Sequence, residues 1–88
     1  MEITKSVSAG SLESSDVLVN LGPGQNGCMD IMVESIVEKQ FGRRIREITE
    51  ELFAHNDITE AMVRIQDKGA LECTLRARLE TAIERARD

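Results

Sequence analysis

The sequence of 88 residues contains no tryptophan and no tyrosine, and Phe41 and Phe53 are its only phenylalanines. It therefore lacks the aromatic platforms on which nucleobases stack. Acidic residues outnumber Lys and Arg by 16 to 11, and the net charge of −5 argues against a nucleic-acid partner. With so few aromatic residues, the core has to be built from aliphatic side chains.

Long apolar runs are also missing. No segment approaches the ~20 apolar residues of a membrane span, and the first ten residues have no apolar stretch of signal-peptide length. The two cysteines, Cys28 and Cys73, are far apart and form no CxxC pair. This spacing predicts free thiols in a cytoplasmic protein, with no zinc site and no membrane partner.

Catalytic groups are scarce. His55 is the only histidine, so any Ser-His or Cys-His pair would have to use it. We expect His55 at a helix end, where the helix dipole favours a cationic ring. The acidic residues are scattered and suggest no convergent pair for acid–base catalysis. The sequence therefore predicts no catalytic residue and no metal site.

The first third of the chain has the period of β-strands. Residues 7–9 predict a weak first strand, and apolar and polar side chains alternate over residues 17–21 and 29–33. The stretch G-P-G-Q-N-G at residues 22–27 has the letters of a dinucleotide-binding loop, but strand period follows it, so we interpret it as a turn. Three strands with short connections predict an antiparallel meander.

The period then changes to that of a helix. A capping box from Ser35 to Glu38 predicts its start, and Asn56 is expected to close it in the left-handed conformation near residues 55–57. The apolar stripe of this helix is predicted to be Val37, Phe41, Ile45, Ile48 and Leu52.

A fourth strand is predicted over residues 61–65, and Asp67 is expected to cap a second helix. The stripe of that helix is predicted to be Leu71, Leu75, either Leu79 or Arg78, Ala82, Ile83 and Ala86. The element order β-β-β-α-β-α predicts a two-layer α+β fold in a single domain, residues 1–88. Its four-stranded, mainly antiparallel sheet should carry both helices on one face.

Two surface features each have two possible interpretations. The segment G-S-L-E-S-S-D at residues 10–16 is expected at the tip of the first hairpin, either as turn chemistry or as a point of covalent attachment. Arg43, Arg44 and Arg46 form the densest basic patch. This patch is either a solvated helix face or a docking patch for an acidic partner or for a phosphate of an attached group.

Three separated blocks resemble the acyl carrier protein (gamma chain) family of bacterial citrate lyase. They are A-G-S-L-E-S-S-D at residues 9–16, V-E-K-Q-F-G at residues 37–42 and D-K-G-A-L-E-C-T-L-R-A-R-L-E at residues 67–80. The resemblance covers nearly the whole chain in the same order and spacing. It places the family's modified serine on Ser14, and the next position, Ser15 here, is often Gly in the family.

The resemblance implies a function. Ser14 would carry phosphoribosyl dephospho-coenzyme A through a phosphodiester, and the thiol of that group would hold acetyl or citryl thioesters while citrate is cleaved to oxaloacetate and acetate. The implied partners are the alpha subunit (acyl transferase), the beta subunit (citryl lyase) and a prosthetic-group transferase, all in the cytoplasm. The chain itself would be a carrier and not an enzyme.

Two other classes compete with this hypothesis. A plain interaction or regulatory module would show no covalent adduct, and a stand-alone enzyme would be active as the isolated, unmodified chain.

Overall fold

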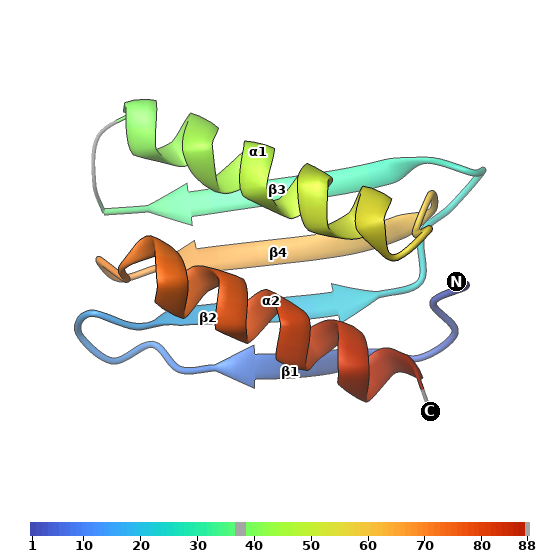
Figure 1. The fold of residues 1–88 in the computed structure, drawn as a ribbon, viewed down its shortest axis with the longest axis horizontal. Coiled ribbons are helices and arrows are strands. Elements are labelled where there is room, and N and C mark those ends of the chain that lie inside the picture. The colour runs from blue at the N-terminus through green and yellow to red at the C-terminus, as the bar shows by residue number, and fades with distance from the viewer. Residues whose placement is uncertain (37–38, 88) are drawn as a thin grey trace.

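The computed structural model describes residues 1–36 and 39–87 of the chain. Four strands form one sheet, and two helices cover the same face of it (Figure 1). The predicted two-layer α+β architecture and the order β-β-β-α-β-α are confirmed. The elements are β1 (Val7–Gly10), β2 (Val17–Gly22), β3 (Met29–Ser35), α1 (Lys39–His55), β4 (Ala61–Asp67) and α2 (Glu72–Arg87).

Alternating side chains give the sheet one apolar face, as the sequence predicts. Val17 and Val19 of β2 are fully buried, as are Ala61 and Ile65 of β4, because they point toward the helices. The face without helices, called the open face here, carries the side chains between them. The core therefore lies between the sheet and the two helices.

The predicted meander is wrong at the third strand. The strands are ordered β1-β2-β4-β3, so β4 separates β2 from β3. β1 pairs with β2 and β2 with β4 in antiparallel fashion, whereas β3 and β4 are parallel. Parallel neighbours need a long crossover connection, and α1 supplies it. The sheet remains mainly antiparallel, as expected.

The G-P-G-Q-N-G stretch carries the chain past the start of β4 and does not close a two-stranded hairpin. A Cβ atom added to Gly24 would lie 2.5 Å from the Ala61 nitrogen, so only glycine permits this close passage. The Ala61 N–H donates to the Cys28 carbonyl (3.3 Å), and the Gly27 N–H donates to the Glu60 carboxylate (2.7 Å). These bonds fasten the crossing to the first residues of β4.

Helix α1 packs with the predicted stripe. Ile45 and Ile48 are fully buried, and Leu52 is buried as well. The helix ends at His55 as predicted, but Asp57 adopts the left-handed conformation (φ 56°) in place of Asn56. Asn56 closes the helix differently, because its side-chain amide donates to the Leu52 carbonyl at 2.8 Å.

The predicted capping box of α1 includes Glu38, which lies outside the described residues, as does Val37 of the stripe. The Ser35 hydroxyl donates to the Asp67 carboxylate (3.0 Å), which links the ends of β3 and β4. Phe41 is half-buried against the core, and Phe53 is buried without having been assigned to the stripe.

Helix α2 is not capped by Asp67, in contrast to the prediction. Asp67 is the buried last residue of β4, and its carboxylate accepts the Ala70 N–H (3.0 Å) in the turn before the helix. The Leu71 carbonyl instead accepts the first helical bond, from Leu75 at 3.0 Å. The Leu71 side chain is 71% exposed, so its place in the predicted stripe is also wrong. The remaining predicted stripe residues, Leu75, Leu79, Ala82, Ile83 and Ala86, are buried.

Each edge strand receives an arginine from the helix above it. The Arg46 guanidinium of α1 donates to the Ile31 carbonyl of β3 at 2.7 Å. The Arg85 guanidinium of α2 donates to the Ser8 carbonyl of β1 at 2.6 Å. Both outer strands thus have a backbone carbonyl occupied by a side chain.

Candidate functional site

The loop of residues 11–16 joins β1 to β2 at one end of the sheet (Figure 1). It begins after Gly10, whose φ is +94° and where a Cβ atom would lie 1.8 Å from the Val17 carbonyl oxygen. Any other residue would therefore force the loop apart. Within the loop the Asp16 N–H donates to the Glu13 carbonyl (3.1 Å), which closes a tight turn.

Ser14 and Ser15 occupy the two central positions of this turn. Ser15 has a φ of 66°, the left-handed conformation that glycine adopts without strain. A glycine at position 15 would adopt this conformation without strain. The predicted exposure of Ser14 at a hairpin tip is confirmed.

The loop rests on the turn between β4 and α2. The Ser15 N–H donates to the Lys68 carbonyl (2.8 Å), and the Lys68 N–H donates back to the Asp16 carbonyl (2.9 Å). These two backbone bonds fix the residues that follow Ser14. Ser14 is therefore presented to solvent from an anchored turn.

Asp16 is the centre of the network that holds the loop. Its carboxylate accepts hydrogen bonds from the Arg78 guanidinium of α2 (3.1 and 3.2 Å), the Ser11 hydroxyl (2.7 Å) and the Val17 N–H (2.7 Å). These donors, Arg78 foremost, lower the pKa of Asp16 from 3.8 to about 2. Asp16 therefore stays ionised at neutral pH and serves the structure of the loop.

The three serines of the segment differ in their hydrogen bonds. The Ser11 hydroxyl donates to Asp16 and accepts the Glu13 N–H at 3.2 Å, so it is committed to the loop. Ser14 and Ser15 are both exposed. Within the part of the chain that the structure describes, the Ser14 hydroxyl makes no hydrogen bond. Among the serines of the loop, Ser14 and Ser15 are the two with available hydroxyls.

The basic patch of α1 does not form one binding surface. Arg44 pairs with Glu72 of α2 (2.9 Å), which raises the pKa of Arg44 and lowers that of Glu72. Arg46 is bound to the edge of β3. Arg43 is exposed and makes no ion pair with a described residue. Two of the three arginines thus serve the fold, which favours the solvated-face interpretation.

The other candidate groups are not brought together. His55 is exposed at the end of α1, and Cys28 and Cys73 are free and exposed. Over residues 1–36 and 39–87, no three His, Cys, Asp or Glu side chains are grouped as metal ligands would be. None of the helices seen in this described part is both long and apolar enough to cross a membrane.

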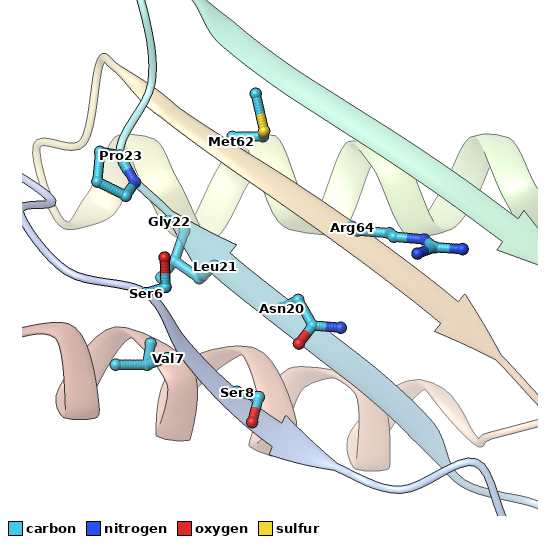
Figure 2. Close-up of a pocket in the computed structure, with 9 residues that line it drawn as sticks. All are labelled: Ser6, Val7, Ser8, Asn20, Leu21, Gly22, Pro23, Met62 and Arg64. Carbon is cyan, nitrogen blue, oxygen red and sulfur yellow. The ribbon is translucent and has the colours of Figure 1, made fainter.

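A pocket of about 380 Å³ lies on the open face of the sheet. Figure 2 shows Asn20, Met62 and Arg64 at this pocket on the side of the strands away from the helices. Gly22 and Pro23 line it where β2 ends, whereas the 11–16 loop is at the opposite end of β2. The pocket is therefore separate from the serine turn.

Sequence reasoning missed the Asp16–Arg78 pair. The sequence identifies Asp16 only as a member of the turn segment at residues 10–16. The two residues are 62 positions apart, and no local motif links them. Their pairing depends on the placement of α2 over β1 and β2.

The structure thus presents the exposed Ser14 hydroxyl on an anchored turn. Residues 4–86 match the sequence model of a family described as ACP: Malonate decarboxylase delta subunit (MdcD). The chain belongs to this family of acyl carrier proteins.

Curated relatives agree with this assignment. The citrate lyase acyl carrier protein of Serratia proteamaculans is 47% identical over 88 residues, which are 100% of this chain and 86% of the relative. The protein of the same name from Streptococcus uberis is 48% identical over 86 residues, 98% of this chain and 84% of the relative. The resemblance drawn from the three sequence blocks is confirmed, and with it the expectation of a carrier in place of an enzyme.

A solved structure shares the fold. A chain in the crystal structure of a Pseudomonas malonate decarboxylase hetero-tetramer in complex with malonate has a TM-score of 0.80 and 30% sequence identity. The match covers 98% of the present chain and 88% of the other.

Proposed function

We propose that this chain is the acyl carrier subunit of citrate lyase and that Ser14 carries phosphoribosyl dephospho-coenzyme A. The observation that carries the proposal is the exposed Ser14 hydroxyl, which stands on a turn fixed by the backbone bonds of Ser15 and Asp16. The name shared by relatives that are 44–48% identical supports the link to citrate lyase. We further propose that residues 1–88 act as one carrier domain in the cytoplasm, where Cys28 and Cys73 stay reduced.

The local geometry suits a bulky attached group at Ser14. Such a group needs an oxygen that is free of other bonds and clear of protein atoms. Modification of Ser11 would break its hydrogen bond to Asp16 (2.7 Å) and weaken the support of the loop. Ser15 is exposed as well, and the resemblance to the family selects Ser14 over it.

The loading step makes the Ser14 oxygen a nucleophile. This oxygen forms a P–O bond to the phosphorus that is bonded to the ribosyl group of an activated precursor. The bond from that phosphorus to the polyphosphate breaks, the polyphosphate departs with the electron pair, and the hydroxyl proton passes to a base. Asp16 is not that base, because a carboxylate with a pKa of about 2 that is hydrogen-bonded to Arg78 binds protons too weakly. We propose that the transferase supplies the base.

When bound, the group supplies a thiol on a long arm that holds acetyl or citryl as a thioester. The residues of this chain fix where the arm begins: the bonds between Ser15, Asp16 and Lys68 keep Ser14 at one place on the domain. Tethering raises the effective concentration of the thioester at partner active sites. The alpha subunit exchanges acetyl for citryl, and the beta subunit releases oxaloacetate and restores the acetyl form.

A second candidate is the carrier subunit of a malonate decarboxylase. The family description and the fold shared with the Pseudomonas hetero-tetramer favour it. The attachment site would be the same, but the partner enzymes would differ. The identity of 47–48% to citrate lyase carriers, against 30% to the malonate decarboxylase chain, favours citrate lyase.

The test compares two neighbouring serines. Ser14→Ala should abolish loading by the transferase and citrate cleavage by the reconstituted complex. The fold should remain intact, because an exposed hydroxyl contributes only about 0.5 kcal/mol to stability. Ser15→Ala is the matched control and should load normally. Intact mass and peptide mapping report the adduct and its position.

Two outcomes would contradict the proposal at different levels. An adduct on Ser15 or Ser11 with Ser14 bare would overturn the site and leave the carrier function. No adduct on any of the three, with active transferase and precursor present, would exclude the carrier function. Exchange and cleavage of malonyl in place of citryl thioesters would favour the second candidate.

A further inference from the structure

Three large apolar side chains are exposed in the connections at the end of the sheet that carries the 11–16 loop. Leu12 in the 11–16 loop is 51% exposed, Ile36 just after β3 is 68% exposed, and Leu71 just before α2 is 71% exposed. Single exposed apolar residues are ordinary, but several at one place mark an interaction site. We refer to Leu12, Ile36 and Leu71 as the apolar end.

The three residues belong to connections at the same end of the sheet, the left end in Figure 1. The backbone bonds of Lys68 join the 11–16 loop to the turn that leads to Leu71. The register pairs Ser35, the residue before Ile36, with Asp67, the residue before Lys68. Segments far apart in sequence thus bring these side chains to the end of the domain that presents Ser14.

The fold makes little use of these side chains. Leu71 contributes its backbone carbonyl to the start of α2, while its side chain is in solvent. The charged residues Glu13 and Lys68 stand beside the apolar end. An apolar centre with a charged surround is the composition of a protein–protein interface.

We infer that the apolar end is the docking surface of the transferase that loads Ser14, an inference that rests on the proposed function. This enzyme must bring a phosphorus atom within bonding distance of the Ser14 oxygen, so its surface has to cover the residues around that oxygen. Of the proposed partners, the transferase is the one whose reaction takes place at the Ser14 oxygen itself. The transferase should present a complementary apolar depression beside its active site.

Two substitutions remove the apolar side chains without changing charge. Leu71→Asn preserves α2, because position 71 precedes the helix and Asn is a favourable N-cap residue. Leu12→Asn alters a half-exposed side chain in a loop. Met32→Gln is the matched control, since Met32 is 61% exposed but lies on β3, on the open face of the sheet.

Loading is followed by intact mass at carrier concentrations well below saturation, which gives kcat/KM for each variant. Leu12→Asn and Leu71→Asn should each lower kcat/KM about tenfold, because each removes the burial of one leucine in the interface. Met32→Gln should load like the wild type. Once loaded to completion, all variants should support citrate cleavage at the wild-type rate per loaded chain.

Three outcomes would overturn the inference. Wild-type loading rates in both leucine variants would show that the transferase does not use the apolar end. A loss of citrate cleavage per loaded chain, with loading unchanged, would assign the surface to the lyase subunits. If the wild type itself takes no group at Ser14, the proposed function fails and the inference falls with it. Slow loading of the leucine variants at Ser14, by contrast, supports both.

Discussion

Replacing Ser15 with glycine should stabilise the protein. Ser15 has a φ of 66°, a conformation that costs an L-residue about 1–2 kcal/mol and glycine almost nothing. Glycine also gives the unfolded chain more freedom, which costs about 0.4–1 kcal/mol. The Ser15 side chain is exposed, so its loss should remove no packing. We therefore expect Ser15→Gly to increase the free energy of unfolding by about 0.5–1 kcal/mol.

The assay is thermal and denaturant unfolding of the unmodified chain. With an unfolding entropy of about 2.1 cal/mol/K per residue, this gain raises the melting temperature of an 88-residue protein by roughly 3–5 °C. The matched control is Ser14→Gly at the neighbouring turn position, which is not among the residues of positive φ. At position 14 no backbone strain is relieved to offset the added freedom of the unfolded chain. The free energy of unfolding of Ser14→Gly should therefore fall by about 0.4–1 kcal/mol.

Comparing the stabilities of Ser15→Gly and Ser14→Gly shows whether the left-handed conformation of Ser15 is strained. If Ser15→Gly is no more stable than the wild type, or if both variants lose stability equally, the left-handed conformation of Ser15 is not a source of strain. The loading of Ser14 should be unchanged in Ser15→Gly, since the bond from the residue 15 N–H to Lys68 is a backbone bond that glycine retains.

Two further predictions concern the core and the loop network. Ile45→Ala should lower the free energy of unfolding by about 2–5 kcal/mol, because Ile45 is fully buried between α1 and the sheet; a change near zero in denaturant unfolding would contradict this packing. The pKa of Asp16 is lowered to about 2, so ionised Asp16 stabilises the fold above pH 3.8, and this contribution is lost as the pH falls toward 2. Asp16→Asn should therefore be less stable than the wild type above pH 3.8, and this difference in the free energy of unfolding should shrink toward pH 2. Urea unfolding at several pH values measures it, and a difference that does not change with pH would refute the role of the charge.

The local elements of the fold could be predicted because their signals are local. The alternation in residues 17–21 and 61–65 and the stripe of Ile45, Ile48 and Leu52 each describe one buried face. The order of the strands could not be predicted from these patterns, because they do not specify the neighbour of a strand. The helix between β3 and β4 was the available signal, since such a connection permits parallel pairing.

The candidate site was partly predictable, because the turn residues that form it are a local signal. Turn residues and the family resemblance led to Ser14 within one short segment. The anchoring of that segment depends on Lys68 and Arg78, which come close to it only when β4 and α2 are in place. Asp67 is a second example of a role that the sequence does not predict. Aspartate is a favourable helix cap, but the Asp67 carboxylate accepts hydrogen bonds from the Ser35 hydroxyl and the Ala70 N–H instead.

The arginines on the two outer strands have a consequence for how the protein behaves in a crowded solution. An open sheet exposes unpaired backbone groups along its outer strands, and these can recruit a strand from another molecule and start aggregation. Arg46 and Arg85 each donate a hydrogen bond to one carbonyl of an outer strand and place a positive charge beside it. A charged side chain on each outer strand thus disfavours the addition of a strand from another molecule.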